Sequence, residues 1–196
     1  MNEARKARDT PMIRNPFRRD TARTRAIEAL HVRINAGARV PALYLDLGVP
    51  DTVEGRFEAL CLHVVLVLRH LRRLPAPAAD IAQDLVNSVF EQLDSSLREL
   101  GVGDMGVSKR MKKLAQAFYG RAAAYDAALD AGDVDGLAVV LARNVLARED
   151  VDAARGLAAY VAAADAGLAA SDLDALMAEG PALPDPSRFA GHPARG

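Results

Sequence analysis

The sequence predicts an all-α fold, arranged as a single compact bundle of about six to seven helices. Alanine and leucine, which favour helix, are abundant, whereas aromatic residues make up only 5 % of the chain and tryptophan is absent. No stretch shows the sustained alternation of β-branched and polar residues that is typical of strands. A chain of 196 residues is also long enough to bury a real core. We therefore expect a flexible basic arm over residues 1–24, an all-α domain over residues 25–180 and a flexible proline-rich tail over residues 181–196.

The first part of the domain is expected to contain two helices joined by an apolar loop. The first helix spans Arg25–Ala36 and ends at a glycine, and the loop covers Val40–Val49. The second helix spans about Thr52–Leu74, with Asp51 as its cap and Glu54 completing a capping box. Its middle, ALCLHVVLVL, is apolar all round. This pattern indicates a central helix that is packed on more than one face.

The remaining helices are recognised by amphipathic periodicity and by the glycine, proline and aspartate residues that separate them. Ser171 is expected to cap the last, short helix. The expected ranges are Asp80–Leu100, Val107–Leu129, Leu137–Arg148, Val151–Ala170 and Asp172–Glu179.

The net charge of −1 conceals an asymmetry along the chain. Residues 1–113 contain 19 Lys+Arg and 14 Asp+Glu, a balance of +5, while residues 114–196 contain 6 and 12, a balance of −6. Either one side of the protein faces anionic lipid or nucleic acid, or the asymmetry is an ordinary property of a globular surface. The basic residues 1–24 leave the same choice between a lipid- or RNA-contacting arm and a solubilising tail.

Cysteine usage and hydropathy bear on where the protein works. The only cysteine, Cys61, excludes an intramolecular disulfide, fits a reducing compartment and is expected to be buried. Residues 1–20 lack the apolar core of a secretory signal, and the longest apolar run, Ala59–Leu68, is about half the length that spans a bilayer. We expect a cytoplasmic protein, with any membrane association being peripheral.

Several motifs resemble catalytic or ligand-binding sites but lack the necessary context. The sequence from Gly101 to Gly106 spells GxGxxG, yet a helix and not a strand precedes it, so a connection between two helices is expected. His63 and His70 share a helix face without a third ligand, which indicates structural histidines. No paired carboxylates or nucleophile motif stand out. We expect no enzymatic activity, no metal and no cofactor.

The expected helix Val107–Leu129 has the most informative pattern. Its apolar residues recur at steps of three and four and form one continuous stripe, with lysines on the opposite side. Two interpretations remain open, namely a core helix with a solvated basic back, and a binding surface for phosphates, lipid head groups or an acidic partner. The candidate client- or membrane-binding residues are Lys109, Arg110, Lys112, Lys113, Phe118, Tyr119 and Arg121.

Two long blocks of the sequence resemble a known family. The blocks are LYLDLGVPDTVEGRFEALCLHVVLVLRHL (Leu43–Leu71) and LRELGVGDMGVSKRMKKLAQAFYGRAAAYDAAL (Leu97–Leu129). They are similar to the ubiquinol–cytochrome c chaperone family, which comprises bacterial, chiefly alphaproteobacterial, relatives of the mitochondrial assembly factor for respiratory complex III. The positions that match the family pattern, besides the seven candidates above, are Asp51, Gly55, Arg56, Phe57, Gly101, Gly103, Asp104, Gly106 and Gly120.

The resemblance implies a non-enzymatic, all-α assembly chaperone. Its implied partners are newly made cytochrome b, the ribosome, an anionic membrane surface and a small partner assembly factor, without specific DNA binding. An apolar groove between the helices Thr52–Leu74 and Val107–Leu129, lined by Phe118 and Tyr119, is the expected cover for apolar client segments. The alternative function is a ribosome- or RNA-binding helical module that uses the same cations.

Overall fold

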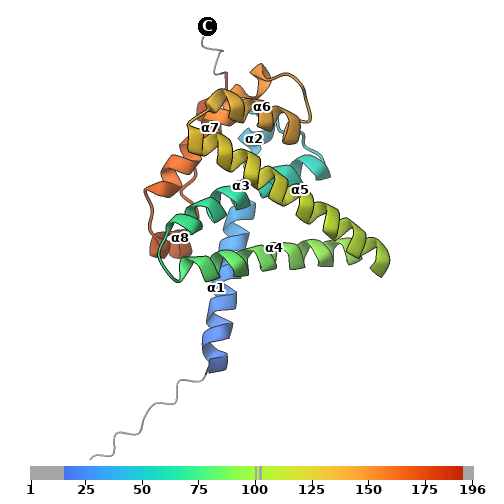
Figure 1. The fold of residues 1–196 in the computed structure, drawn as a ribbon, viewed down its shortest axis with the longest axis vertical. Coiled ribbons are helices and arrows are strands. Elements are labelled where there is room, and N and C mark those ends of the chain that lie inside the picture. Colours follow the sequence, from blue (N-terminus) through green and yellow to red (C-terminus); the bar gives the residue numbers. More distant parts are fainter. Residues whose placement is uncertain (1–15, 100, 102, 192–196) are drawn as a thin grey trace, which may run out of the picture.

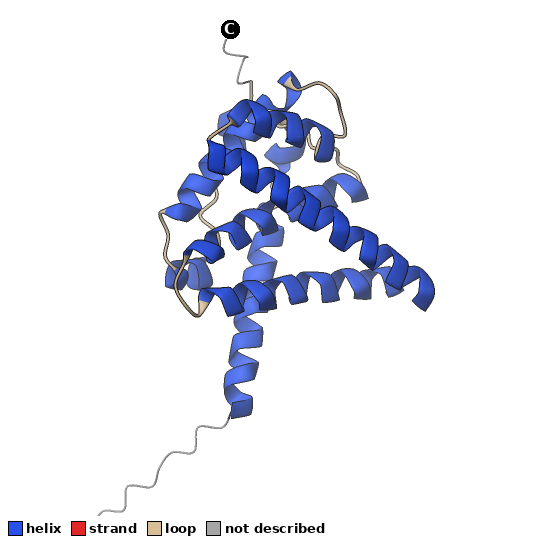
Figure 2. Ribbon diagram, in the orientation of Figure 1, coloured by secondary structure: helices blue, strands red, loops and turns tan. Residues whose placement is uncertain are grey.

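The computed structural model describes the backbone of residues 16–99, 101 and 103–191, with side chains from residue 21 onward. Within these residues the fold consists of eight α-helices and two short 3-10 helices, without strands (Figures 1 and 2). The prediction of an all-α bundle is confirmed, with more helices than the six to seven expected.

Helix α3 (Val53–Arg73) lies at the centre of the bundle. Every residue from Cys61 to Leu71 is buried. The helix packs against α1 (Pro16–Gly37), α4 (Ala78–Glu99), α5 (Asp104–Ala131) and α7 (Arg155–Ala169). The expected central helix is therefore confirmed, and the buried thiol of Cys61 agrees with the prediction.

Helix α1 begins earlier than expected. It starts at Pro16, whereas the sequence predicted a helix from Arg25 and a flexible arm before it. Ile27, Leu30 and Ile34 are buried as predicted, and they anchor the second half of this helix. Proline suits the first turn of a helix because its missing N–H has no intrahelical partner there. The arm boundary at residue 24 is wrong, while residues 1–15 lie outside the described residues.

The expected loop Val40–Val49 contains a short helix, α2 (Pro41–Leu45). Leu43, Leu47 and Val49 are buried, so this segment adds to the core. The sequence predicted a loop here because a helix of five residues is too short to show a helical period.

The cap of α3 also differs from the prediction. Thr52, and not Asp51, is the N-cap, and its hydroxyl accepts a hydrogen bond from the N–H of Gly55. A capping box needs a long acceptor side chain at the position of Gly55, so Glu54 does not complete one. Asp51 instead forms an ion pair with Arg56 at 2.7 Å.

Helices α4 and α5 form an arm that projects from the body (Figure 1). They follow each other in the chain, and the end of α4 and the start of α5 extend together beyond the other helices. We call this part the α4–α5 arm. Phe90 of α4 and Phe118 of α5 pack edge to face with ring centroids 5.8 Å apart, which joins the two helices.

Two short helices in the second half of the chain begin with aspartate caps. Asp133 accepts from the N–H of Gly136 at the start of α6 (Val134–Asn144), which begins three residues before the expected Leu137. Asp172, and not Ser171, caps α8 (Leu173–Glu179), and the hydroxyl of Ser171 donates to Leu168 instead. The 3-10 helix η1 (Asp152–Ala154) precedes α7.

The segment after Pro181 packs against the body and is not a loose tail. The methyl group of Leu183 lies so close to Gly37 that a Cβ there would come within 2.5 Å of it. Phe189, in the 3-10 helix η2 (Pro186–Phe189), stacks edge to face on Tyr160 at 5.8 Å. The expectation of a flexible tail is wrong up to residue 191, because two apolar anchors outweigh the proline-rich composition; residues 192–196 lie outside the described residues.

Candidate functional site

The stripe of apolar residues on α5 faces inward, as the sequence predicted. Val107, Phe118 and Tyr125 are buried, and the stripe residues between them are partly buried. Helix α5 begins at Asp104, so Gly106 lies in its first turn rather than in a connecting loop. The true connection is shorter than the predicted glycine-rich loop, and Gly103 is the residue before the helix.

The opposite side of α5 is exposed over its N-terminal two thirds. We call this surface, made of residues about half a helical turn away from the stripe, the outer face of α5. Arg110, at one edge of the face, is also exposed. The residues of the outer face are Met105, Lys109, Lys112, Lys113, Gln116 and Tyr119.

The four neighbouring cations of this region have no ion-pair partner among the described residues. Within the described part of the chain, no carboxylate lies within 4.0 Å of the charged groups of Lys109, Arg110, Lys112 or Lys113. Their charge is therefore presented to solvent or to a partner.

Two of the predicted contact residues lie elsewhere. Phe118 is only 3 % exposed, because its ring packs against Phe90 and belongs to the core. Arg121 is partly buried and forms an ion pair of 2.5 Å with Glu58 of α3. Burial raises the pKa of the Glu58 carboxyl, and the Arg121 guanidinium opposes this shift. Neither residue forms part of the outer face.

Among the described residues, the middle of α3 does not form a wall of the predicted apolar groove between α3 and α5. The middle of α3 is enclosed on all sides, so it offers no apolar surface to a client. The sequence pattern had already marked α3 as apolar all round, and packing by the body uses all of that surface. Tyr119, which was expected to line the groove, is 58 % exposed on the outer face instead.

The first family block has a structural role at the start of α3. Gly55 has no room for a side chain, since a Cβ would come within 2.0 Å of the carbonyl oxygen of Pro50. The ion pair between Asp51 and Arg56 closes the same turn, and Phe57 packs against the core. These four positions therefore shape the connection between α2 and α3.

The glycines of the second block are less constrained. Gly101 has a positive φ of 79°, which favours glycine in the connection to α5. A Cβ added at Gly103 or Gly120 would meet no heavy atom of the described residues within 4 Å. Gly106 is exposed in the first turn of α5. No contact in this part of the structure explains glycine at Gly103 or Gly120.

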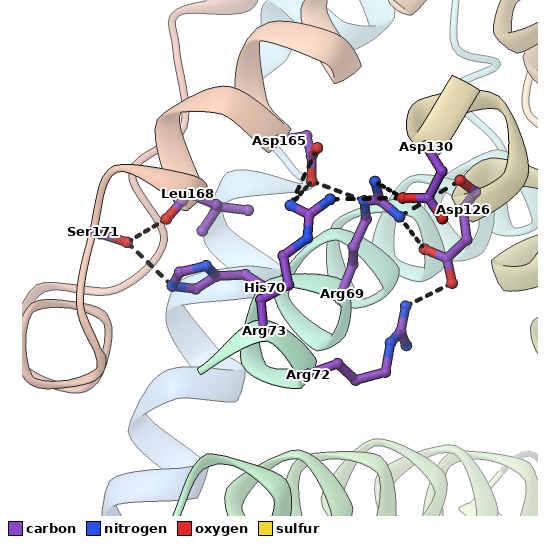
Figure 3. A network of polar contacts seen from close by, with 9 residues as sticks. All are labelled: Arg69, His70, Arg72, Arg73, Asp126, Asp130, Asp165, Leu168 and Ser171. Atoms are coloured by element: carbon purple, nitrogen blue, oxygen red, sulfur yellow. Dashed lines mark hydrogen bonds and ion pairs between the residues drawn. The ribbon is translucent and has the colours of Figure 1, made fainter. Parts of the chain in front are cut away.

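A cluster of ion pairs that the sequence did not predict joins α3, α5 and α7 (Figure 3). Arg69 of α3 is buried, and its guanidinium contacts Asp126 and Asp130 of α5 and Asp165 of α7 at 3.2, 2.6 and 3.1 Å. The hydrogen bond from Arg69 lowers the pKa of Asp130. Arg72 and Arg73 extend the cluster toward solvent.

The cluster explains part of the charge asymmetry of the chain. Its arginines come from the basic first part and its aspartates from the acidic second part, so these opposite charges meet inside one molecule. The sequence feature that could have revealed this cluster is the run RHLRR at the end of an apolar helix. Arg69 lies on a side of that helix that has to be buried, and a buried arginine needs carboxylate partners.

The histidines of α3 are held by hydrogen bonds within the core. The Nδ1–H of His63 donates to the carbonyl of Ala59, which leaves Nε2 to accept from the hydroxyl of Tyr160 at 2.7 Å. Burial lowers the pKa of His63 to about 4. The Nε2 atom of His70 lies 3.4 Å from the hydroxyl oxygen of Ser171 (Figure 3). Among the described residues, no group of three His, Cys, Asp or Glu side chains is arranged to hold a metal ion.

The chain is similar to known proteins over most of its length. A family described as Ubiquinol-cytochrome C chaperone matches residues 45–183. The crystal structure of the Cbp3 homolog from Brucella abortus matches with a TM-score of 0.77 and 40 % sequence identity, over 88 % of this chain and 96 % of that chain. A search of the curated proteins finds no match. In the described part of the chain, every helix is too short or too polar to cross a bilayer.

Proposed function

The chain belongs to the ubiquinol–cytochrome c chaperone family, and from this premise we propose that it is a non-catalytic assembly chaperone for ubiquinol–cytochrome c reductase, respiratory complex III. The single observation that carries the proposal is the family match, which covers both the body and the α4–α5 arm. The Cbp3 homolog from Brucella abortus supports it with a similar fold along nearly its whole length.

The client that we propose is newly made cytochrome b, bound on the cytoplasmic side of the inner membrane. A membrane protein with long apolar helices requires protection and guidance before its partner subunits arrive. A small partner factor and the ribosome are further partners in this proposal, because the resemblance of the sequence blocks implies them.

The chemistry of the site in this proposal is that of a binding surface. The outer face of α5, with Arg110 at its edge, is the candidate surface for the client or the membrane. Its support is physical, since unpaired cations that protrude on an arm attract an anionic partner over about a Debye length. Phe118 and Arg121 hold α5 against α4 and α3, so they position this surface without contacting the partner.

The decisive experiment is deletion of the gene in its own host. We expect the amount of assembled ubiquinol–cytochrome c reductase and of spectrally detected cytochrome b to fall strongly, with restoration by the intact gene. Unchanged levels of both would contradict the chaperone function.

A second experiment tests the surface. A variant with Lys109→Glu, Lys112→Glu and Lys113→Glu should fold normally but fail to restore cytochrome b in the deletion strain. The matched control reverses three exposed arginines of the body, by Arg143→Glu, Arg148→Glu and Arg188→Glu. If both variants restore cytochrome b equally, the outer face of α5 is not the working surface. If the first variant instead loses RNA binding alone, the RNA-binding alternative is favoured.

A further inference from the structure

We propose that the outer face of α5 binds an anionic phospholipid bilayer directly, with α5 lying along the bilayer surface and with Met105 and Tyr119 entering the interface. This inference rests on the proposed function and deepens it, because it assigns the face to lipid and leaves the client to another surface.

The charge of this helix has a single sign over a long stretch. Between Met105 and Tyr125 the sequence contains no Asp or Glu and five Lys or Arg residues, of which Arg121 pairs with Glu58 and the other four have no ion pair among the described residues. The acids on either side are already engaged, since Asp104 pairs with Arg98 at 2.5 Å and Asp126 with Arg72 at 2.6 Å. An extended, unneutralised row of cations is complementary to a plane of negative head groups.

Two apolar side chains on the same face distinguish a bilayer from other polyanions. Met105 is 91 % exposed and Tyr119 is 58 % exposed. They lie at the two ends of the lysine row, about 21 Å apart along the helix at a rise of about 1.5 Å per residue. A phenol ring is suited to the boundary between head groups and acyl chains, and a thioether side chain gains free energy there by leaving water.

The shape of the molecule permits this contact. The joined ends of α4 and α5 extend beyond the remaining helices, so the exposed residues of α5 are carried on a projection (Figure 1). The apolar stripe of the same helix is occupied by contacts with the rest of the arm and body, which directs the lysines away from them. A flat partner therefore meets the outer face before it meets the core.

The test is co-sedimentation of the full chain with vesicles of two compositions. One contains phosphatidylcholine alone, and in the other about a third of the lipid is phosphatidylglycerol. We expect binding to the anionic vesicles only. The variant Lys109→Gln, Lys112→Gln, Lys113→Gln should bind on the order of a hundredfold more weakly, at about fivefold per cation. The double variant Met105→Gln, Tyr119→Ser should bind about tenfold more weakly than the unaltered chain. This ratio should be the same in high salt, because the apolar contribution is not screened.

Matched variants show whether the location of the residues matters. The triple variant Arg143→Gln, Arg148→Gln, Arg188→Gln removes the same charge from the body, and Leu45→Gln removes another exposed apolar side chain. Both should bind like the unaltered chain. Equal losses in the two triple variants, or binding to poly-uridine RNA without binding to vesicles, would overturn the inference. Vesicle binding and complex III assembly are separate measurements, so a chain that fails only the first retains its proposed function.

Discussion

Helices α3 and α5 are neighbours in the bundle, but their polar residues are in opposite situations. The charged and polar groups in the middle of α3 are buried and paired, as in Arg69 with its three aspartates and His63 with Tyr160. Those on the outer face of α5 are exposed and unpaired among the described residues. Burying a charge is costly unless partners surround it, whereas an exposed lysine needs none. The contrast indicates that α3 holds the bundle together, and it is consistent with the proposed role of α5 as a binding surface.

Among substitutions that compare buried and exposed polar residues, the largest loss of stability is expected at Arg69. The substitution Arg69→Ala leaves Asp126 and Asp165 without their buried partner, and we expect a loss of about 3–5 kcal/mol in the free energy of unfolding, measured by urea denaturation. The control is Arg72→Ala on the same helix, which also pairs with Asp126 but is half exposed. It should cost less than about 1 kcal/mol. Equal costs would show that the burial of Arg69 is unimportant.

The neighbours Phe118 and Tyr119 sharpen the contrast within α5 itself. Phe118→Ala removes a buried ring that contacts Phe90 and should destabilise the protein by about 3 kcal/mol. Tyr119→Ala alters an exposed residue and should change stability by less than about 0.5 kcal/mol. Thermal unfolding of the two variants provides the measurement. A large loss in the second variant would mean that Tyr119 belongs to the core.

Periodicity was sufficient to predict much of this arrangement. The apolar stripe of α5 and the apolar middle of α3 follow directly from the spacing of Val107, Phe118 and Tyr125 and from the run Ala59–Leu68. Together with the composition, these patterns were enough to predict the all-α fold class. These periodic patterns are local, because the spacing of apolar residues over a few helical turns is enough to show which side of the helix is buried.

The errors came from contacts between distant parts of the chain. Arg121 and Phe118 were candidate contact residues because no local pattern reveals their partners, Glu58 and Phe90, which are 63 and 28 residues away. The tail looked loose because its anchors bind to Gly37 and Tyr160, which no local pattern reveals. Likewise, the groove between α3 and α5 was predicted from two apolar helices, without the other helices that pack against α3 and bury its apolar residues.

The protonation of His63 provides a smaller effect that tests the enclosed helix. Its pKa is about 4 in the folded protein, well below the unperturbed value of about 6.5, so the unfolded chain binds a proton first as the pH falls. Stability is therefore complete above about pH 6.5 and decreases through the window down to about pH 4, with a loss of about 2 kcal/mol between pH 7 and pH 5. Urea denaturation at both pH values measures it.

The variant His63→Gln isolates this contribution. His31 and His70 also have pKa values lowered mainly by burial, so the unaltered protein loses stability from more than one histidine. The difference in stability between pH 7 and pH 5 should shrink by about 2 kcal/mol in the variant. An unchanged difference would mean that water reaches His63 and that α3 is less enclosed than its burial indicates.

The smallest effect on stability is expected on the outer face of α5. Lys109 lies three and four residues before Lys112 and Lys113, a spacing at which like charges repel across a helix turn. Replacing all three by glutamine should therefore leave the free energy of unfolding unchanged or raise it by about 0.5 kcal/mol. Urea denaturation compares the variant with Arg143→Gln, Arg148→Gln, Arg188→Gln. A loss above about 1 kcal/mol would make the lysines structural and would remove the contrast between α3 and α5. If the variant is as stable as the unaltered protein, almost all of it is folded. A loss of vesicle binding or of cytochrome b in that variant then results from the changed surface and not from unfolding.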